Sequence, residues 1–461
     1  MPPLLALAIG FGLVIWLLRT DFRHRSTGAS ALWVPALLVL IGASRPVNYW
    51  VEMMGLASGG ESNSESSPAN LLTLLFIISS AVWVLVQRQA PFAKIISENK
   101  TLFLLYLYFM ISSVWSPDAF VSFRRIIKDM GIVFVALVVL TSPKPWMSLR
   151  VLFVRCSYFI LPISLVTSKY FPTVGRYTSK SWESFYTGLT THKNTLGLVA
   201  LIFLLFLIWD YVDCPKEIAP ENLKLAKRQR LLVIGIGVAL ILMAQSATSQ
   251  ICLMLGLGLF FYVRRLSALP NGRRKFHTAL ISVVVLAAAD KMLGISPMIA
   301  EAFGRNMTLT GRTAIWDVAL SHQQSFLHGF GYNAFWDTDL AFVVYDELGD
   351  FIHIRTVHNG YLEVFLDGGI IGVGMLALFL IGTFLKTYRR AFVLRPMQAM
   401  PLALFFVTAI YNNSESSFLR SDLLWYVFLT ISLDTVAMPH SVSEEPDPDY
   451  LPLDEPEEHH V

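Results

Sequence analysis

The stretch TLGLVALIFLLFLIWDYV, residues 195–212, decides the fold class. It has no charged residue before Asp210, and its apolar residues show neither the alternation of a half-buried strand nor the single stripe of a surface helix. A helix of about 18 residues that is apolar on every side is either buried in a protein core or spans a membrane. The rest of the sequence decides between these two settings.

The composition of the whole chain favours a membrane. Of 461 residues, 54% are hydrophobic and 15% are charged, and the mean hydropathy is +0.56. Soluble domains usually carry about 25% charged residues. This composition excludes a soluble enzyme and a single-span receptor. The net charge of +3 is too small to indicate a nucleic-acid partner.

Apolar runs recur along the chain and predict an all-α fold, a polytopic transmembrane helix bundle of about 12–13 spans. The first run has no basic segment before it, so it is interpreted as a retained span and not as a cleaved signal. The runs lie at 3–19, 31–43, 69–87, 101–115, 126–141, 149–167, 195–212, 231–246, 248–264, 276–293, 361–385, 398–412 and 420–437. The short runs at 31 and 126 fit tilted or re-entrant segments equally well.

These runs divide the chain into four regions. Residues 1–293 hold the first ten transmembrane helices, and residues 294–357 form a large loop that is expected to be partly helical. Residues 358–437 hold the C-terminal transmembrane helices. Residues 438–461 are rich in Asp, Glu and Pro and predict an acidic, disordered tail.

The basic residues predict which face each loop occupies. When alternate loops are compared, one set carries about twice as many Lys and Arg residues as the other, and the richer set is cytoplasmic by the positive-inside rule. The N-terminus then faces out, the acidic tail lies inside, and the loops 168–194 and 294–357 lie on the outer face. Basic residues on that face need another reason to be there, and anion binding is the simplest.

The outer loops contain residue types suited to group transfer. Arginine binds phosphate oxygens with two parallel donors, so Arg312, Arg176 and Arg355 are candidate phosphate ligands. Histidine has an unperturbed pKa of about 6.5 and can take a proton from a hydroxyl near neutral pH. An Arg and a His together suit displacement at an anomeric carbon that releases a phosphate or pyrophosphate.

Aromatic residues of the same loop are candidates for contact with sugars. Trp316, Tyr332 and Trp336 could each stack on a sugar face, and each could equally be part of an interfacial aromatic belt.

Two carboxylates, Glu363 and Asp367, follow His358 into an apolar run, where acidic residues are costly. Either could orient His358, or only cap the helix N-terminus. No metal site is expected, because His353 and His358 lie five residues apart and no carboxylate has a recognised metal spacing with them.

Several of these residues lie in motifs that resemble one known family. The sequence HNGYLEVFLDGGIIG at 358–372 resembles the signature of O-antigen ligases and Wzy-type polymerases, which is His-Asn, nine residues, and Gly-x-x-Gly. The other elements are similar to motifs of the same family or of ExoQ-like exopolysaccharide polymerases: WSPD at 115–118 with Arg124 and Arg125, THKNTLG at 191–197, GRTAIW at 311–316, GFG at 329–331 and NSES at 413–416.

The resemblance implies an inverting, metal-independent glycosyltransferase without a cofactor, in the bacterial inner membrane with its active face in the periplasm. Its donor would be an undecaprenyl-diphosphate-linked oligosaccharide within the membrane lipid, and its expected partners are a flippase and a chain-length regulator. Carried over by position, His358 is the general base and Arg312 a diphosphate ligand. Arg176, Lys193 and Arg355 are further cations, and the supporting residues are Asn359, Glu363, Asp367, His192, Asn194 and Glu415.

The chain departs from the family pattern at one position. Family members often carry Arg or Lys after a Ser at the start of a span where this chain has Ser246 and Ala247. Alanine cannot bind phosphate, so another residue must supply that cation.

Three functions remain open from the sequence. A polymerase of lipid-linked repeat units is favoured by the ExoQ-like elements. An O-antigen ligase, which transfers the glycan to lipid A-core, shares the His358 signature. A non-enzymatic polysaccharide or lipid transporter is the alternative of another class, although no internal repeat is visible.

Overall fold

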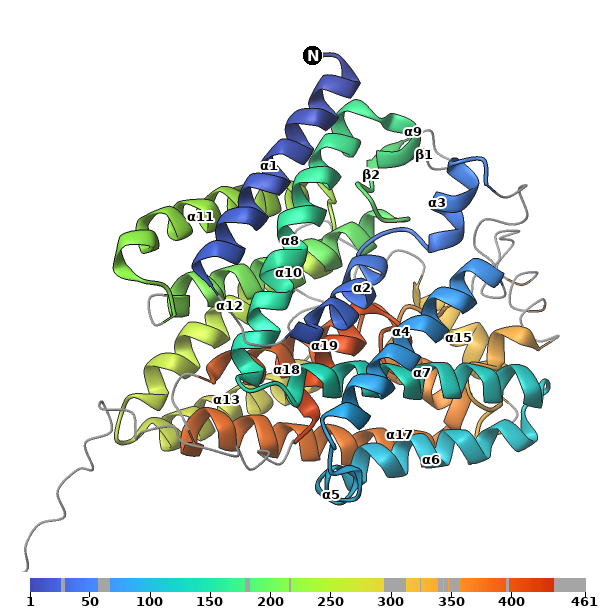
Figure 1. The fold of residues 1–461 in the computed structure, drawn as a ribbon. Coiled ribbons are helices and arrows are strands. Elements are labelled where there is room, and N and C mark those ends of the chain that lie inside the picture. Colours follow the sequence, from blue (N-terminus) through green and yellow to red (C-terminus); the bar gives the residue numbers. More distant parts are fainter. Residues whose placement is uncertain are drawn as a thin grey trace, which may run out of the picture.

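The computed structural model describes residues 1–25, 30–56, 67–178, 183–214, 217–293, 312–323, 325–338, 343, 347, 356–394 and 398–434. Helices dominate this part of the chain, and its one sheet is an antiparallel pair of three-residue strands (Figure 1). The elements are α1 Pro3–His24, η1 Ser30–Leu32, α2 Trp33–Gly42, α3 Val47–Met53, α4 Pro68–Gln87, α5 Phe92–Glu98, α6 Lys100–Ser112, η2 Ser113–Trp115, α7 Ala119–Leu140, α8 Pro145–Tyr170, α9 Pro172–Gly175, β1 Arg176–Thr178, β2 Ser184–Tyr186, α10 Lys193–Asp213, α11 Pro220–Met243, α12 Ala247–Ser267, α13 Gly272–Leu293, α15 Arg312–Ser321, η4 Phe335–Asp337, α17 Gly360–Arg389, the π-helical η5 Arg390–Leu394, α18 Ala399–Tyr411 and α19 Leu423–Ser432.

The stretch 195–212 lies in α10, at the centre of the bundle. Helices α8 and α10 are the most buried of the candidate spans, each with 78% of its apolar window inside the molecule. Helix α10 packs against α8, α11, α12 and α19. Phe153 of α8 stacks on Phe206 of α10 with ring centroids 4.1 Å apart. Other helices therefore cover the apolar surface of α10 on every side. The prediction of an all-α polytopic bundle is confirmed.

Each apolar run predicted from the sequence contains a helix, but the helices differ in length. Within the described residues, six are long and apolar enough to cross a membrane: α1, α4, α8, α10, α12 and the segment Gly360–Val393. A seventh span results if α2 and α3, which are bent by 74°, count as one. The apolar helices α6 with η2, α18 and α19 are shorter. Helices α7 and α11 have the length but carry several charged residues in their first halves.

Helix α17 is kinked at Gly369, which adopts φ 59° and ψ −160°. A kink frees backbone groups that need partners, and the preceding loop supplies them. Ile370 donates its N–H to the Phe326 carbonyl at 3.0 Å, and Gly331 donates to the Asp367 carbonyl at 2.8 Å. Residues 326–331 of the large loop are thereby fixed against residues 366–371 of α17.

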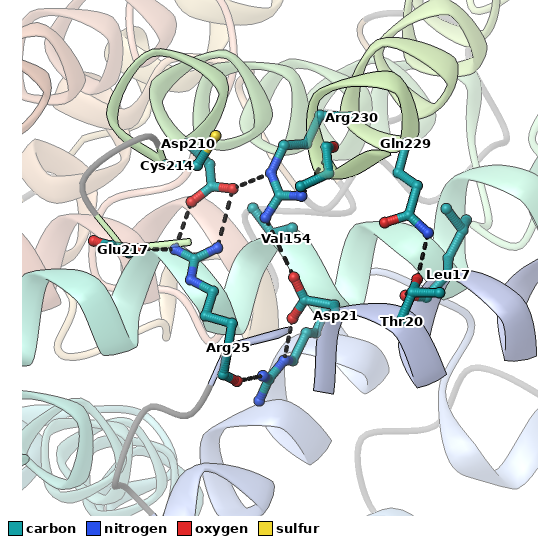
Figure 2. Close-up of polar contacts among 12 residues, drawn as sticks. Leu17, Thr20, Asp21, Arg25, Val154, Asp210, Cys214, Glu217, Gln229 and Arg230 are labelled. Atoms are coloured by element: carbon teal, nitrogen blue, oxygen red, sulfur yellow. Dashed lines mark hydrogen bonds and ion pairs between the residues drawn. The ribbon is translucent and has the colours of Figure 1, made fainter. Parts of the chain in front are cut away.

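A cluster of buried charges joins four helices (Figure 2). Asp210 near the end of α10 is fully buried, and three guanidinium groups contact its carboxylate. Arg25 lies at 2.6 Å, Arg150 at 3.1 Å and Arg230 at 2.5 Å. Arg230 also contacts Asp21 of α1 at 3.2 Å. The cluster therefore ties α1, α8, α10 and α11 together at one end of the bundle.

The variant Asp210→Asn should strongly destabilise the protein. It removes one charge and leaves three buried arginines with too few counter-charges, and breaking a buried ion pair costs about 3–5 kcal/mol. Thermal unfolding in detergent, followed by the loss of the monodisperse peak, measures the effect. The exposed acid Glu98 provides a control, and Glu98→Gln should unfold like the wild type. Equal unfolding temperatures for Asp210→Asn and Glu98→Gln would contradict the role of the cluster.

Candidate active site

The Glu415 carboxylate lies at the point where three of the predicted motifs meet. Its Oε2 lies 3.2 Å from His358 Nδ1, and its Oε1 accepts hydrogen bonds from Arg312 at 3.0 Å and from the Asn194 side chain at 2.9 Å. The Glu415 side chain is 14% exposed. The partners come from the segment before α17, from the start of α15 and from the start of α10. The fold thus brings together predicted site residues that are far apart in the sequence.

Local capping positions His358 ahead of α17. The side chain of Asn359 caps the helix and accepts hydrogen bonds from the N–H groups of Tyr361 at 3.1 Å and Leu362 at 3.2 Å. His358 adopts φ +54°, a left-handed conformation that is strained for a residue other than glycine. Its N–H donates to Thr356 Oγ1 at 3.2 Å. The backbone therefore holds the imidazole in one orientation.

Gly360 allows α17 to start directly against the end of α18. Its N–H donates to the carbonyls of Asn412 at 2.8 Å and Glu415 at 3.1 Å. A Cβ at this position would lie 2.1 Å from Asn412 Oδ1. Only glycine permits this approach, which places the Glu415 loop beside His358.

The contact with Glu415 also determines the tautomer of His358. A carboxylate only accepts hydrogen bonds, so in the neutral imidazole Nδ1 carries the proton and Nε2 keeps a lone pair. In the described part of the chain, Nε2 has no hydrogen-bond partner, and the His358 side chain is 35% exposed. A neutral imidazole with an accessible Nε2 is suited to accept a proton from a hydroxyl.

Glu363 and Asp367, which could orient His358 or only cap the helix N-terminus, have other partners. Glu363 accepts hydrogen bonds from the Val357 N–H at 2.7 Å and from Trp336 Nε1 at 3.1 Å. Asp367 accepts from the backbone of Ala334 at 3.2 Å. Neither contacts His358, so the expectation that one of them orients it is wrong.

The residue that orients His358 is Glu415. The sequence reasoning named it only as a supporting residue. One signal in the sequence pointed to this role. Glu415 is a carboxylate next to an apolar run, and it lies on the face predicted to carry basic residues.

The His-Lys-Asn element forms the opposite wall of the site at the start of α10. His192 Nδ1 accepts from the Asn194 N–H at 3.2 Å, and Tyr177 OH lies 2.9 Å from His192 Nε2. Burial lowers the pKa of His192, which favours its neutral form near neutral pH. The Lys193 ammonium lies 3.8 Å from the ring centroid of Phe185.

Arg176 does not join the Glu415 centre. Arg176 donates to the Ser168 carbonyl at 2.8 Å and lies over the ring of Tyr186 at 4.8 Å, so it stabilises the β1–β2 hairpin. Arg355 lies outside the described residues.

The three residues predicted to stack on sugars differ in their burial and their contacts. Tyr332 is 1% exposed, and its hydroxyl donates to Asp129 and to the Leu419 carbonyl. Its ring belongs to the core, so the predicted contact with a sugar is wrong for Tyr332. Trp316 is half-buried and donates to the Val357 carbonyl at 2.7 Å. Trp336 is half-buried and lines a polar cavity of about 410 Å³.

The start of α12 at Ala247 lies beside the loop that carries Glu415. Helix α12 begins at Ala247, and the next residue, Thr248, lies 2.9 Å from Ser414, hydroxyl to hydroxyl. Arg312 donates to the Ser414 carbonyl. Arg312 therefore contacts the Ser414 loop, which lies beside the start of α12.

The fold and this centre define a polytopic helical membrane protein with a histidine, a carboxylate and an arginine gathered at one end of the bundle. Comparison with known proteins gives two matches. Residues 231–377 match the family model described as O-antigen ligase. The exopolysaccharide production protein ExoQ of Rhizobium meliloti (strain 1021) is 32% identical over 158 residues, which cover 32% of this chain and 36% of that protein. The resemblance predicted from the motifs is confirmed, over about a third of the length of that relative.

The variant Gly360→Ala should damage the site and the fold together. Overpacking at such a contact costs about 1–3 kcal/mol, because the new Cβ would overlap Asn412. Gly374→Ala is the matched control, since it lies in the same helix and its added methyl group would meet no described atom within 4 Å. Thermal unfolding should separate the two variants, with Gly374→Ala as stable as the wild type. A stable Gly360→Ala variant would contradict this packing.

Proposed function

We propose that this chain transfers a glycan from a polyprenyl-diphosphate-linked donor to a hydroxyl acceptor, at the periplasmic face of the bacterial inner membrane and with inversion at the anomeric carbon. The observation that carries the proposal is the Glu415 carboxylate, which holds His358 and Arg312 at the same point. A proton acceptor and a permanent cation are thereby placed side by side, as this reaction requires.

The reaction is a single displacement. His358 Nε2 takes the proton of the acceptor hydroxyl while its oxygen attacks the anomeric carbon. The bond between that carbon and the phosphate oxygen breaks, and its electron pair leaves with the lipid diphosphate. Glu415 accepts a hydrogen bond from Nδ1 and stabilises the imidazolium that forms, in the way a carboxylate supports a catalytic histidine elsewhere.

Arg312 and Lys193 would stabilise the departing diphosphate. A guanidinium has five N–H donors, and Arg312 uses some of them for Glu415 and the Ser414 carbonyl. The others remain for phosphate oxygens. Lys193 adds a second cation at the start of α10, next to Asn194, which also holds Glu415. Fixed cations of this kind stabilise charge as it develops without a metal ion.

Polymerisation of lipid-linked repeat units is the favoured form of this reaction. The similarity to an exopolysaccharide production protein supports it. A ligase that transfers the glycan to lipid A-core is the second candidate, since the family model described as O-antigen ligase matches residues 231–377. A flippase that delivers the donor and a chain-length regulator are the partners such a polymerase would need. Deletion of the gene separates the two: single repeat units on lipid indicate a polymerase, and full-length polymer without its lipid A anchor indicates a ligase.

The variant His358→Ala should lose transfer. General-base catalysis contributes about 10²–10⁴-fold to rate, so the product should fall by that factor. The assay incubates the purified protein with a polyprenyl-diphosphate oligosaccharide and measures product length. His277→Ala is the control, because His277 is exposed and stacks on Tyr388, away from the Glu415 centre. Retained transfer by His358→Ala would overturn the enzymatic proposal and leave transport as the alternative.

The variant Glu415→Gln should lower kcat by about 10²-fold, because the amide cannot stabilise the imidazolium as a carboxylate does. The KM for the donor should rise as well, since Arg312 loses the group that holds it. Glu347→Gln is the control: Glu347 also pairs with a histidine, His322 at 2.9 Å, but in another part of the loop. An effect of Glu415→Gln confined to protein stability would contradict its positioning role.

A further inference from the structure

Two cavities meet beside the Glu415 loop. The first has a volume of about 410 Å³ and is polar, with Arg125, Lys128 and Arg420 among its lining residues. The second, of about 390 Å³, is lined largely by apolar residues of α2 and α4. Lys128, Ser421 and Asp422 line both. The polar cavity therefore shares part of its lining with the apolar one.

The polar cavity is lined by three basic and three acidic residues, and one of the basic residues, Lys128, lies where it meets the apolar cavity. The acidic residues have hydrogen-bond or ion-pair partners. Asp337 pairs with Arg125, Asp129 accepts from the hydroxyls of Tyr332 and Ser421, and Asp422 caps α19 through the Trp425 N–H at 2.7 Å.

Arg420 contacts Glu363 at 3.1 Å. Lys128 has no ion pair or hydrogen bond to any residue that the structure describes. Its ammonium is available to an anionic ligand.

The apolar cavity lies at the boundary of the bundle. Its walls include Leu38 and Ile41 of α2 and Leu74 and Ile77 of α4. Helix α4 has only 17% of its apolar window buried, so most of its surface faces outward, and α2 packs beside it (Figure 1).

The corner between α2 and α3 closes one side of this cavity. Asn48 of α3 and Asn70 of α4 hold the corner by hydrogen bonds at 2.9 and 3.0 Å.

The polar cavity also adjoins the segment that carries His358. Ser416 lines it and accepts a hydrogen bond from Thr356 Oγ1 at 3.0 Å. Thr356 in turn accepts from the His358 N–H. A ligand held in this cavity is thereby close to the proposed general base without occupying the Arg312 and Lys193 positions.

We infer that the two cavities together bind a second polyprenyl-diphosphate lipid, the carrier of the acceptor glycan. Its diphosphate lies against Lys128, with Arg125 and Arg420 beside it, and its isoprenoid chain lies between α2 and α4. The inference rests on the proposed function, because joining two lipid-linked glycans requires two diphosphate sites. A soluble anion would not need the apolar cavity, and a phospholipid carries two acyl chains instead of one long chain.

The test counts bound lipids by native mass spectrometry of the full chain in the His358→Ala background, with glycan-free undecaprenyl diphosphate as the probe. We expect two lipids per protein. Adding Lys128→Glu, or Leu74→Trp to fill the apolar cavity, should reduce the number to one. The matched controls are Arg124→Glu, at an exposed position of α7, and Leu75→Trp, at an exposed position of α4 outside the cavity; both should retain two.

Two outcomes would overturn the inference: two lipids retained by both Lys128→Glu and Leu74→Trp, or displacement of the second lipid by an equal concentration of phosphatidylglycerol. Because no turnover occurs in this background, the count is independent of the transfer assay. A protein that binds two lipids but transfers no glycan would contradict the proposed function alone.

Discussion

The pairing of the Glu415 carboxylate is the interaction on which the candidate active site depends. A carboxylate that is largely withdrawn from water is costly unless it is hydrogen-bonded and paired. Glu415 obtains its partners from His358, Arg312 and Asn194, the last of them 221 positions away in the chain. The helices that carry these partners must therefore be packed before the site exists, so folding of the bundle and assembly of the site are one process.

Helix α10 connects this centre to the buried charge cluster at the opposite end of the bundle. Asn194 at its start holds Glu415, and Asp210 near its end holds three arginines. A helix of 21 residues is roughly 30 Å long, which is close to the thickness of the hydrocarbon core. Between the two polar ends its side chains are apolar and buried. It is a rigid spacer, which suits a site that must hold its groups at fixed positions.

Local structure could be predicted from the sequence, but the partners of individual side chains could not. The apolar run 361–385 predicted a helix that follows His358 directly, because such a run is a local feature of the chain. The assignment of Glu363 or Asp367 to His358 used the same kind of proximity and was wrong. Both point to the loop before α17. Tyr332 was predicted to contact a sugar. It is buried instead, and its hydroxyl donates a hydrogen bond to Asp129 of α7.

The sequence by itself determined the all-α membrane fold, the helical segments and the motifs around His358, because hydrophobic runs and capping patterns act over short distances. It also identified Arg312, Asn194 and Glu415 as members of the site, through the resemblance of their motifs. Only the tertiary structure decided that Glu415 joins these residues, and that Lys128 lies where a polar and an apolar cavity meet. Such contacts depend on how helices distant in the chain pack against each other, which no local pattern specifies.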